Sequence, residues 1–159
     1  IYLGEGASFT LDTAQIRGVD HTERMTRAEL AGKSTLVVTE RLLTHGTQRA
    51  KSTFEVELNG GGAGVHIVSR AVAKEHSRQL FVSRVNGNAP CSGHTECDAI
   101  LMDDAQVRAV PEIAANCPEA ALIHEAAIGK IAGEQIVKLM TLGLSEQEAE
   151  ERIISGFLK

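Results

Sequence analysis

The sequence has no tryptophan, one tyrosine and four phenylalanines, so aromatic residues make up only 3% of its 159 positions. It also has no block of basic residues, and its formal net charge is −5. A protein that binds nucleic acid needs basic side chains to follow the phosphates and aromatic rings to stack on bases. We therefore expect no nucleic acid partner. With so few aromatic residues, the core must be aliphatic.

Long apolar stretches and export signals are also missing. No segment approaches the roughly 20 apolar residues that span a bilayer, and none has the pattern of a signal peptide. We expect no membrane partner, and we interpret the odd number of cysteines, three, as reduced thiols in a cytoplasmic protein. The chain begins at Ile1 rather than at methionine, and we expect it to be the C-terminal portion of a longer protein.

Between residues 36 and 110 the sequence consists of short apolar segments separated by polar or glycine-rich corners. Alternating segments such as 54–58, followed by Asn-Gly-Gly-Gly at 59–62, predict strands and turns. Repeats of about a dozen residues fit a sandwich, a barrel or a solenoid. Some segments are apolar throughout, as in strands covered on both faces, and the corners are irregular, so a parallel solenoid is favoured over a sandwich. Nearer the N-terminus, strands are predicted at 9–11 and 15–19.

After Gly129 the apolar pattern takes a helical period. Ser145 and Glu148 form a capping box, in which the serine side chain meets the amide three residues on and the glutamate reaches back. Two short helices are therefore predicted. They would cap the open end of a solenoid or present a docking face.

Cys91, His94 and Cys97 form a C-x2-H-x2-C motif, and all three side chain types bind soft or borderline metals. On an extended backbone the two cysteines would share one face and His94 would point to the other. A bulge at 92–93 could bring the three together. Zinc sites usually have more closely spaced pairs, so the alternative interpretation is two small buried thiols and a hydrogen-bonded histidine.

The other candidate residues follow the motif. Cys117 precedes a proline, which predicts a corner, and a lone cysteine there is more often structural than reactive. His124 and Glu125 lie where strand gives way to helix, and on a strand their side chains would point to opposite faces. Nucleophile elbows, phosphate loops and dinucleotide motifs are absent from the sequence, so we expect a protein that is not itself an enzyme.

Seven short motifs, taken in their order along the chain, resemble the core of the SufB/SufD family, which serves the SUF system of iron–sulfur cluster assembly. The motifs are FEVELNG at 54–60, HSRQLF at 76–81, GHT at 93–95, HEA at 124–126, GKI at 129–131, EQ at 134–135 and GLSE at 143–146. The likeness extends from about residue 54 to residue 157. The CSGHT and HEA motifs are SufB-like, whereas the two alanines at 126–127 depart from the SufB pattern.

The resemblance implies a right-handed parallel β-helix at 1–128, followed by a helical region at 129–159. In this family the helical region docks an ABC-type ATPase, SufC, and we expect Ile136, Leu139 and Ile153 to form that docking face. A second SufB/SufD-type subunit, identical or different, would pair through the C-terminal strands.

The resemblance also implies a transient iron–sulfur cluster at the subunit interface, and leaves flavin binding and the sulfur donor system open. Cys91 would be the leading ligand or sulfur acceptor, with His124 and Glu125 assisting. His94, Cys97 and Cys117 are additional candidate ligands. Thiolates form such clusters, and imidazole or carboxylate ligands suit a cluster that must be released. The alternative is a SufD-like structural partner that docks the ATPase without binding a cluster.

Overall fold

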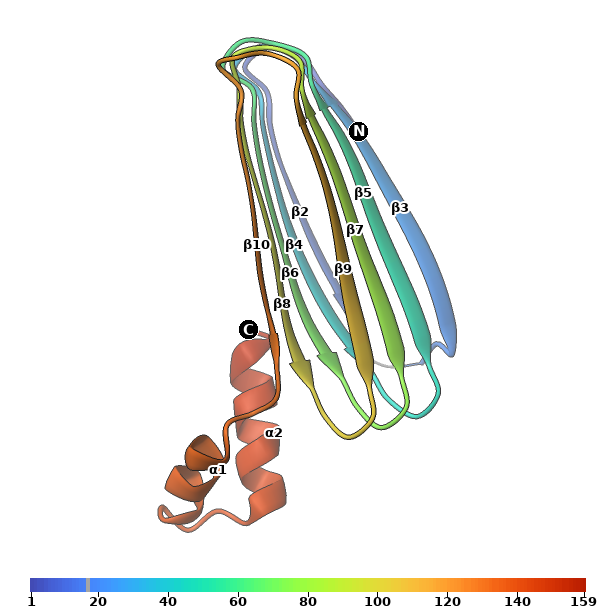
Figure 1. The fold of residues 1–159 in the computed structure, drawn as a ribbon, viewed down its shortest axis with the longest axis vertical. Coiled ribbons are helices and arrows are strands. Elements are labelled where there is room, and N and C mark those ends of the chain that lie inside the picture. Colours follow the sequence, from blue (N-terminus) through green and yellow to red (C-terminus); the bar gives the residue numbers. More distant parts are fainter. Residues whose placement is uncertain (17) are drawn as a thin grey trace.

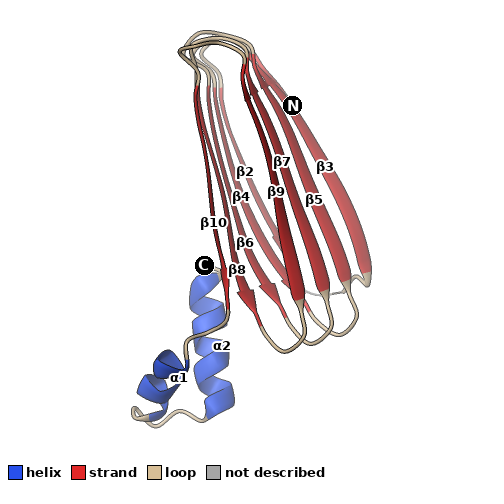
Figure 2. Ribbon diagram, in the orientation of Figure 1, coloured by secondary structure: helices blue, strands red, loops and turns tan. Residues whose placement is uncertain are grey.

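The computed structural model, which describes residues 1–16 and 18–159, consists of a long stack of parallel strands followed by two helices (Figures 1 and 2). The strands are β1 (Tyr2–Leu3), β2 (Ser8–Gln15), β3 (His21–Leu30), β4 (Thr35–Thr44), β5 (Arg49–Leu58), β6 (Gly64–Ala73), β7 (Arg78–Gly87), β8 (Ser92–Leu101), β9 (Gln106–Ala115) and β10 (Ala121–Gly129). The helices are α1 (Gly133–Met140) and α2 (Glu146–Phe157).

Consecutive strands alternate between two sheets, which have the orders β1-β3-β5-β7-β9 and β10-β8-β6-β4-β2. Every neighbouring pair is parallel, and Thr35 pairs with Gly64, which in turn pairs with Ser92. One coil of the chain therefore takes 28 or 29 residues, except at the N-terminal end, where β1 and β2 pair with an offset of 27. This confirms the predicted parallel β-solenoid with C-terminal helices, and the sandwich alternative is wrong because it would require antiparallel hairpins.

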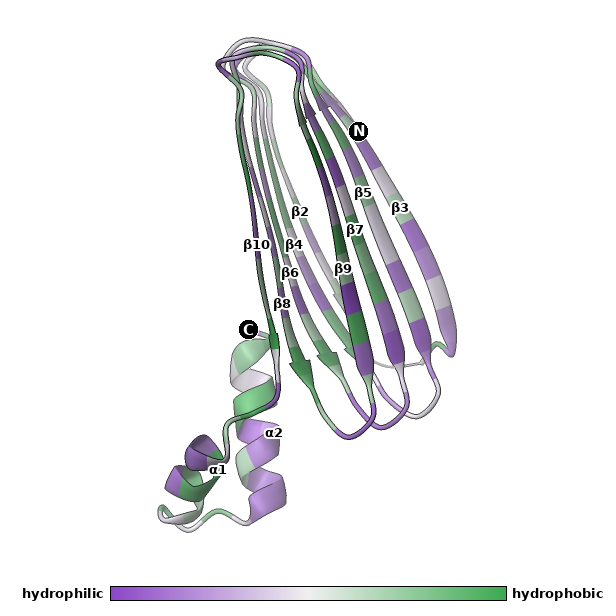
Figure 3. Ribbon diagram, in the orientation of Figure 1, coloured by the Kyte–Doolittle hydropathy of each residue, from purple (hydrophilic) through white to green (hydrophobic). Residues whose placement is uncertain are grey.

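The strands are longer than the short apolar segments of the sequence. Each strand also includes polar residues that face outwards, between the alternate residues that fill the space between the sheets. Figure 3 shows hydrophilic and hydrophobic residues interspersed along the strands seen face-on, such as β7 and β9. The interior is aliphatic with one aromatic pair, Phe54 and Phe81, whose ring centroids are 5.8 Å apart. The strand predicted at 15–19 is wrong, since β2 ends at Gln15 and β3 begins at His21, with residue 17 outside the described residues.

The corners of successive coils are held in register by side chains. Asn88 donates a hydrogen bond to Asn59 and accepts one from Asn116, each 2.8 Å long. This ladder repeats because the same corner recurs once per coil. It explains why asparagine recurs at the ends of β5, β7 and β9.

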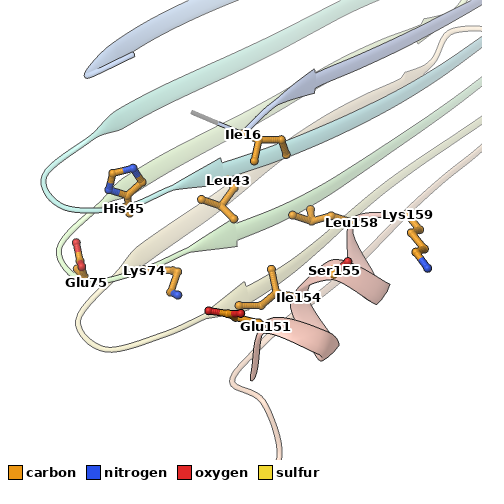
Figure 4. A pocket seen from close by; sticks show the side chains of 10 residues that line it. All are labelled: Ile16, Leu43, His45, Lys74, Glu75, Glu151, Ile154, Ser155, Leu158 and Lys159. Carbon is orange, nitrogen blue, oxygen red and sulfur yellow. The ribbon is translucent and has the colours of Figure 1, made fainter. Parts of the chain in front are cut away.

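The two helices follow β10 and turn back beside the solenoid. Ser145 and Glu148 form the predicted capping box at the start of α2, and Ala149 and Ile154 of this helix are buried. A cleft of about 800 Å³ lies between α2 and the C-terminal ends of β2, β4 and β6. Figure 4 shows its lining residues, with Leu43 on one side and Ile154 on the other. No helix in the described part of the chain is long and apolar enough to cross a membrane.

Candidate functional site

The solenoid ends in β9 and β10, the last strands of the two sheets (Figure 1). Among residues 1–16 and 18–159, no further strand pairs with the outer edge of either one. Ile113, Ile123 and Ile128 on these strands are 42%, 56% and 39% exposed. Unpaired backbone groups beside exposed apolar side chains form a surface on which another protein can dock.

Strand β8 is unbroken, and it stays in register with β6 from Ser92 to Leu101. Cys91 and Cys97 are consequently buried towards the interior, while His94 faces outwards. The strand has no bulge at 92–93, so the C-x2-H-x2-C motif does not gather around one point. The structure therefore has the arrangement expected of an extended backbone, with both cysteines on one face and His94 on the other.

The thiols differ in their surroundings. Cys97 is fully buried, and burial, helped by the charge of Asp98, raises its pKa to about 12. The Cys117 thiol donates a hydrogen bond of 3.0 Å to Glu119. This hydrogen bond is the main reason why the pKa of Cys117 is raised. Metal ligation uses the thiolate, so Cys97 in particular is held in the form that binds metals poorly.

His124 and Glu125 point to opposite sides of β10, as expected for neighbours on a strand. The His124 ring faces inwards, where its Nδ1 lies 2.6 Å from the Thr95 hydroxyl. Its Nε2 is buried and has no hydrogen-bond partner among the described residues. Burial, and then the nearby His94, lower the pKa of His124, so the ring is neutral at pH 7 and able to act as a ligand.

Glu125 faces outwards and accepts a hydrogen bond of 2.9 Å from His94 Nε2. Cys91 lies inside the solenoid, four residues before Thr95, which is the register partner of His124. Four residues of strand span about 13 Å. The three leading candidate ligands therefore do not converge within one copy of the chain.

Two residues beside this site are not among the candidates that the sequence pattern indicates. His66 on β6 pairs in register with His94, and Glu96 on β8 with Glu125. The coil length of 28 or 29 residues is the signal that would have found them. It brings together side chains that are distant in sequence.

The helical residues predicted to dock the ATPase, Ile136, Leu139 and Ile153, are half-buried. The apolar side chains that this region exposes most are different ones: Val137 (59%), Met140 (44%) and Leu142 (73%). We call these three the helical apolar patch.

Comparison with known proteins identifies the family. Residues 1–157 match the family model described as "SUF system FeS cluster assembly, SufBD core domain". The chain is 34% identical to an iron–sulfur cluster assembly SufBD family protein of Methanothermobacter thermautotrophicus, over 99% of this chain and 39% of that protein. It is 32% identical to one of Methanocaldococcus jannaschii, over 96% of this chain and 48% of that protein.

The chain thus spans less than half the length of these curated relatives. Within that length the match covers the solenoid and both helices. The chain belongs to the SufBD family, the core-domain family of SUF-system iron–sulfur cluster assembly.

Proposed function

We propose that this chain is a scaffold for iron–sulfur cluster assembly, which holds a nascent cluster where the open end of its solenoid meets a second SufB/SufD-type subunit. The observation that carries the proposal is the His124 ring: it is neutral, it lies on the last strand, and its buried Nε2 has no partner among the described residues. A buried polar atom without a partner costs free energy, and ligation would remove that cost.

The dispersed ligands support a site shared between subunits. Cys91, His124 and Glu125 lie too far apart to surround one cluster in a single copy, but pairing two solenoid ends would bring a second set of ligands to the seam. No strand among the described residues pairs with the outer edges of β9 and β10, and these edges, with exposed Ile123 beside them, fit such a pairing. Incomplete ligation within each subunit also suits a cluster that must be passed on.

A second candidate function is a structural partner that docks the ATPase without holding a cluster. The buried thiol of Cys97 favours it, because its pKa of about 12 makes thiolate ligation at neutral pH costly. The two functions differ in what the isolated protein acquires from iron and sulfide.

Anaerobic reconstitution with ferrous iron and sulfide separates them. We expect the wild-type dimer to acquire iron, sulfide and charge-transfer absorbance, and His124→Ala to keep less than about a tenth of them, since loss of even an outer-shell partner of a ligand costs roughly 10–100-fold in metal affinity. The matched control is His21→Ala, which removes an exposed histidine of β3. Full cluster content in both His124→Ala and Cys91→Ser would instead favour the structural partner.

We further propose that the helical apolar patch contributes to the surface that binds a SufC-type ABC ATPase. Val137→Glu would place a charge in the centre of the interface, and we expect it to weaken binding by at least about 30-fold, as loss of a hot spot of about 2 kcal/mol does. Co-purification and titration with the ATPase measure the effect. Gln135→Glu, an exposed change outside the patch, is the control, and equal binding by both variants would contradict the proposal.

A further inference from the structure

The outer face of the last coil carries a cluster of metal-binding side chains that is separate from the buried thiols. His94 and Glu96 are two positions apart on β8, so they share a face, and Glu125 on β10 is the register partner of Glu96. One ligand atom from each of these three residues lies within 4.8 Å of the other two. We propose that His94, Glu96 and Glu125 form a binding site for a divalent first-row transition metal ion.

The spacing suits an ion between the three groups. Nitrogen and oxygen ligands lie about 2.0–2.2 Å from such a metal, so two ligand atoms of one ion are at most about 4.4 Å apart. The three ligand atoms already lie within 4.8 Å of one another, and rotation of the side chains can close the remaining difference. The backbone would not move, because β6, β8 and β10 fix the register of the cluster.

The donor types set the class of metal. One imidazole and two carboxylates suit zinc, ferrous iron or cobalt better than calcium or magnesium, which prefer all-oxygen sites. A second imidazole stands next to the cluster, since the His66 and His94 ring centroids are 5.1 Å apart. His66 is therefore placed to complete the shell or to hold the His94 ring in position.

The partial exposure of the site suits an ion that must enter and leave. The side chain of His94 is 33% exposed and that of Glu125 is 64% exposed, so solvent reaches both ligands. At present their hydrogen bond of 2.9 Å occupies the position of the metal. An incoming cation would replace this hydrogen bond: the ring proton moves from Nε2 to Nδ1, and the cation binds the freed Nε2 lone pair and a Glu125 carboxylate oxygen.

This inference rests on the proposed function in one respect, the identity of the natural ion. In a cluster scaffold it would be ferrous iron, taken up on the outer face of β10. The neighbouring residue in the sequence is His124, which faces inwards and whose buried Nε2 has no hydrogen-bond partner among the described residues. The outer site would then load the seam with iron.

Cobalt(II) is the probe for the test, because it resists oxidation in air better than ferrous iron and its visible absorption reports nitrogen and oxygen ligands. Titration of the untagged chain by calorimetry should give one tight site per chain. We expect His94→Gln and Glu96→Gln each to weaken binding at least about tenfold. His76→Gln and Glu134→Gln remove an exposed histidine and an exposed glutamate elsewhere, and should leave binding unchanged.

Proton NMR of the wild-type protein gives a readout that does not depend on variants. Paramagnetic cobalt should broaden or shift the ring signals of His94 and His66 first, and those of His21 and His45 should stay unchanged. Equal affinities for the site variants and the controls, or shifts confined to other histidines, would overturn the inference.

The same measurements separate this inference from the proposed function. Cobalt binding that depends on His94 and Glu96, with no cluster formed on reconstitution, would support the metal site and contradict the proposed scaffold function. Cluster formation with no such cobalt site would do the reverse.

Discussion

Gly60→Ala is expected to destabilise the solenoid by about 3 kcal/mol or more, at the upper end of what overpacking costs. A Cβ atom at this position would lie 2.0 Å from the Gly32 nitrogen, 2.5 Å from its Cα and 2.6 Å from the carbonyl carbon of Ala31. These are backbone atoms of the neighbouring coil, so no side-chain rotation relieves the clash. The two corners would have to separate.

The adjacent glycine provides the matched control. A Cβ on Gly61 meets nothing within 4 Å, and Gly61 is not among the glycines with a positive φ. Gly61→Ala should therefore leave stability unchanged or raise it slightly, because alanine restricts the unfolded chain. Urea unfolding followed by circular dichroism measures both variants. Equal midpoints would show that the corners of these two coils are not in close contact.

The same triplet of glycines shows where sequence reasoning succeeds and where it stops. Asn-Gly-Gly-Gly at 59–62 predicts a turn, and the structure has one. The sequence does not distinguish Gly60, which has no room for a methyl group, from Gly61, which does. That difference depends on Gly32 of the neighbouring coil, and a local pattern carries no information about it.

The candidate site was likewise predictable from the sequence only in part. The opposite orientations of His124 and Glu125, and of Cys97 and His94, follow from the strand period alone, and the structure has them. Which side chains stand beside them depends on the coil length. Once the repeat of 28 or 29 residues is known, the neighbours of each residue can be listed from the sequence. Without it, His66 looks isolated.

Glu40 is a charged group deep in the interior. Replacing its partner Arg24 is the second change that we expect to lower the stability of the fold strongly. The glutamate is 1% exposed and accepts hydrogen bonds from Ser52 (2.5 Å) and Ser69 (2.8 Å) as well as from Arg24. The two hydroxyls cannot neutralise its charge. Removing one partner of a buried ion pair typically costs about 3–5 kcal/mol, and we expect Arg24→Met to cost about 3 kcal/mol, the lower figure, because the Arg24 side chain is 37% exposed.

Arg27 offers a control on the same strand. Its ion pair with Glu55 is 2.7 Å long, but its side chain is 72% exposed, and exposed pairs contribute about 0–1 kcal/mol. Arg27→Met should therefore lower the free energy of unfolding by less than about 1 kcal/mol. Similar losses for the two arginine variants would mean that Glu40 is not desolvated as the structure indicates.

The double variant Arg24→Met/Glu40→Leu separates two contributions to stability: the cost of leaving the buried Glu40 carboxylate without a partner, and the net contribution of the ion pair itself. Well-packed apolar replacements of a buried pair are often neutral or stabilising. Leucine removes the carboxylate that Ser52 and Ser69 bind, and these hydroxyls then lose their acceptor, so we expect recovery of most but not all of the lost stability. A double variant that is less stable than Arg24→Met alone would show that the interior of the solenoid needs this charge for its packing.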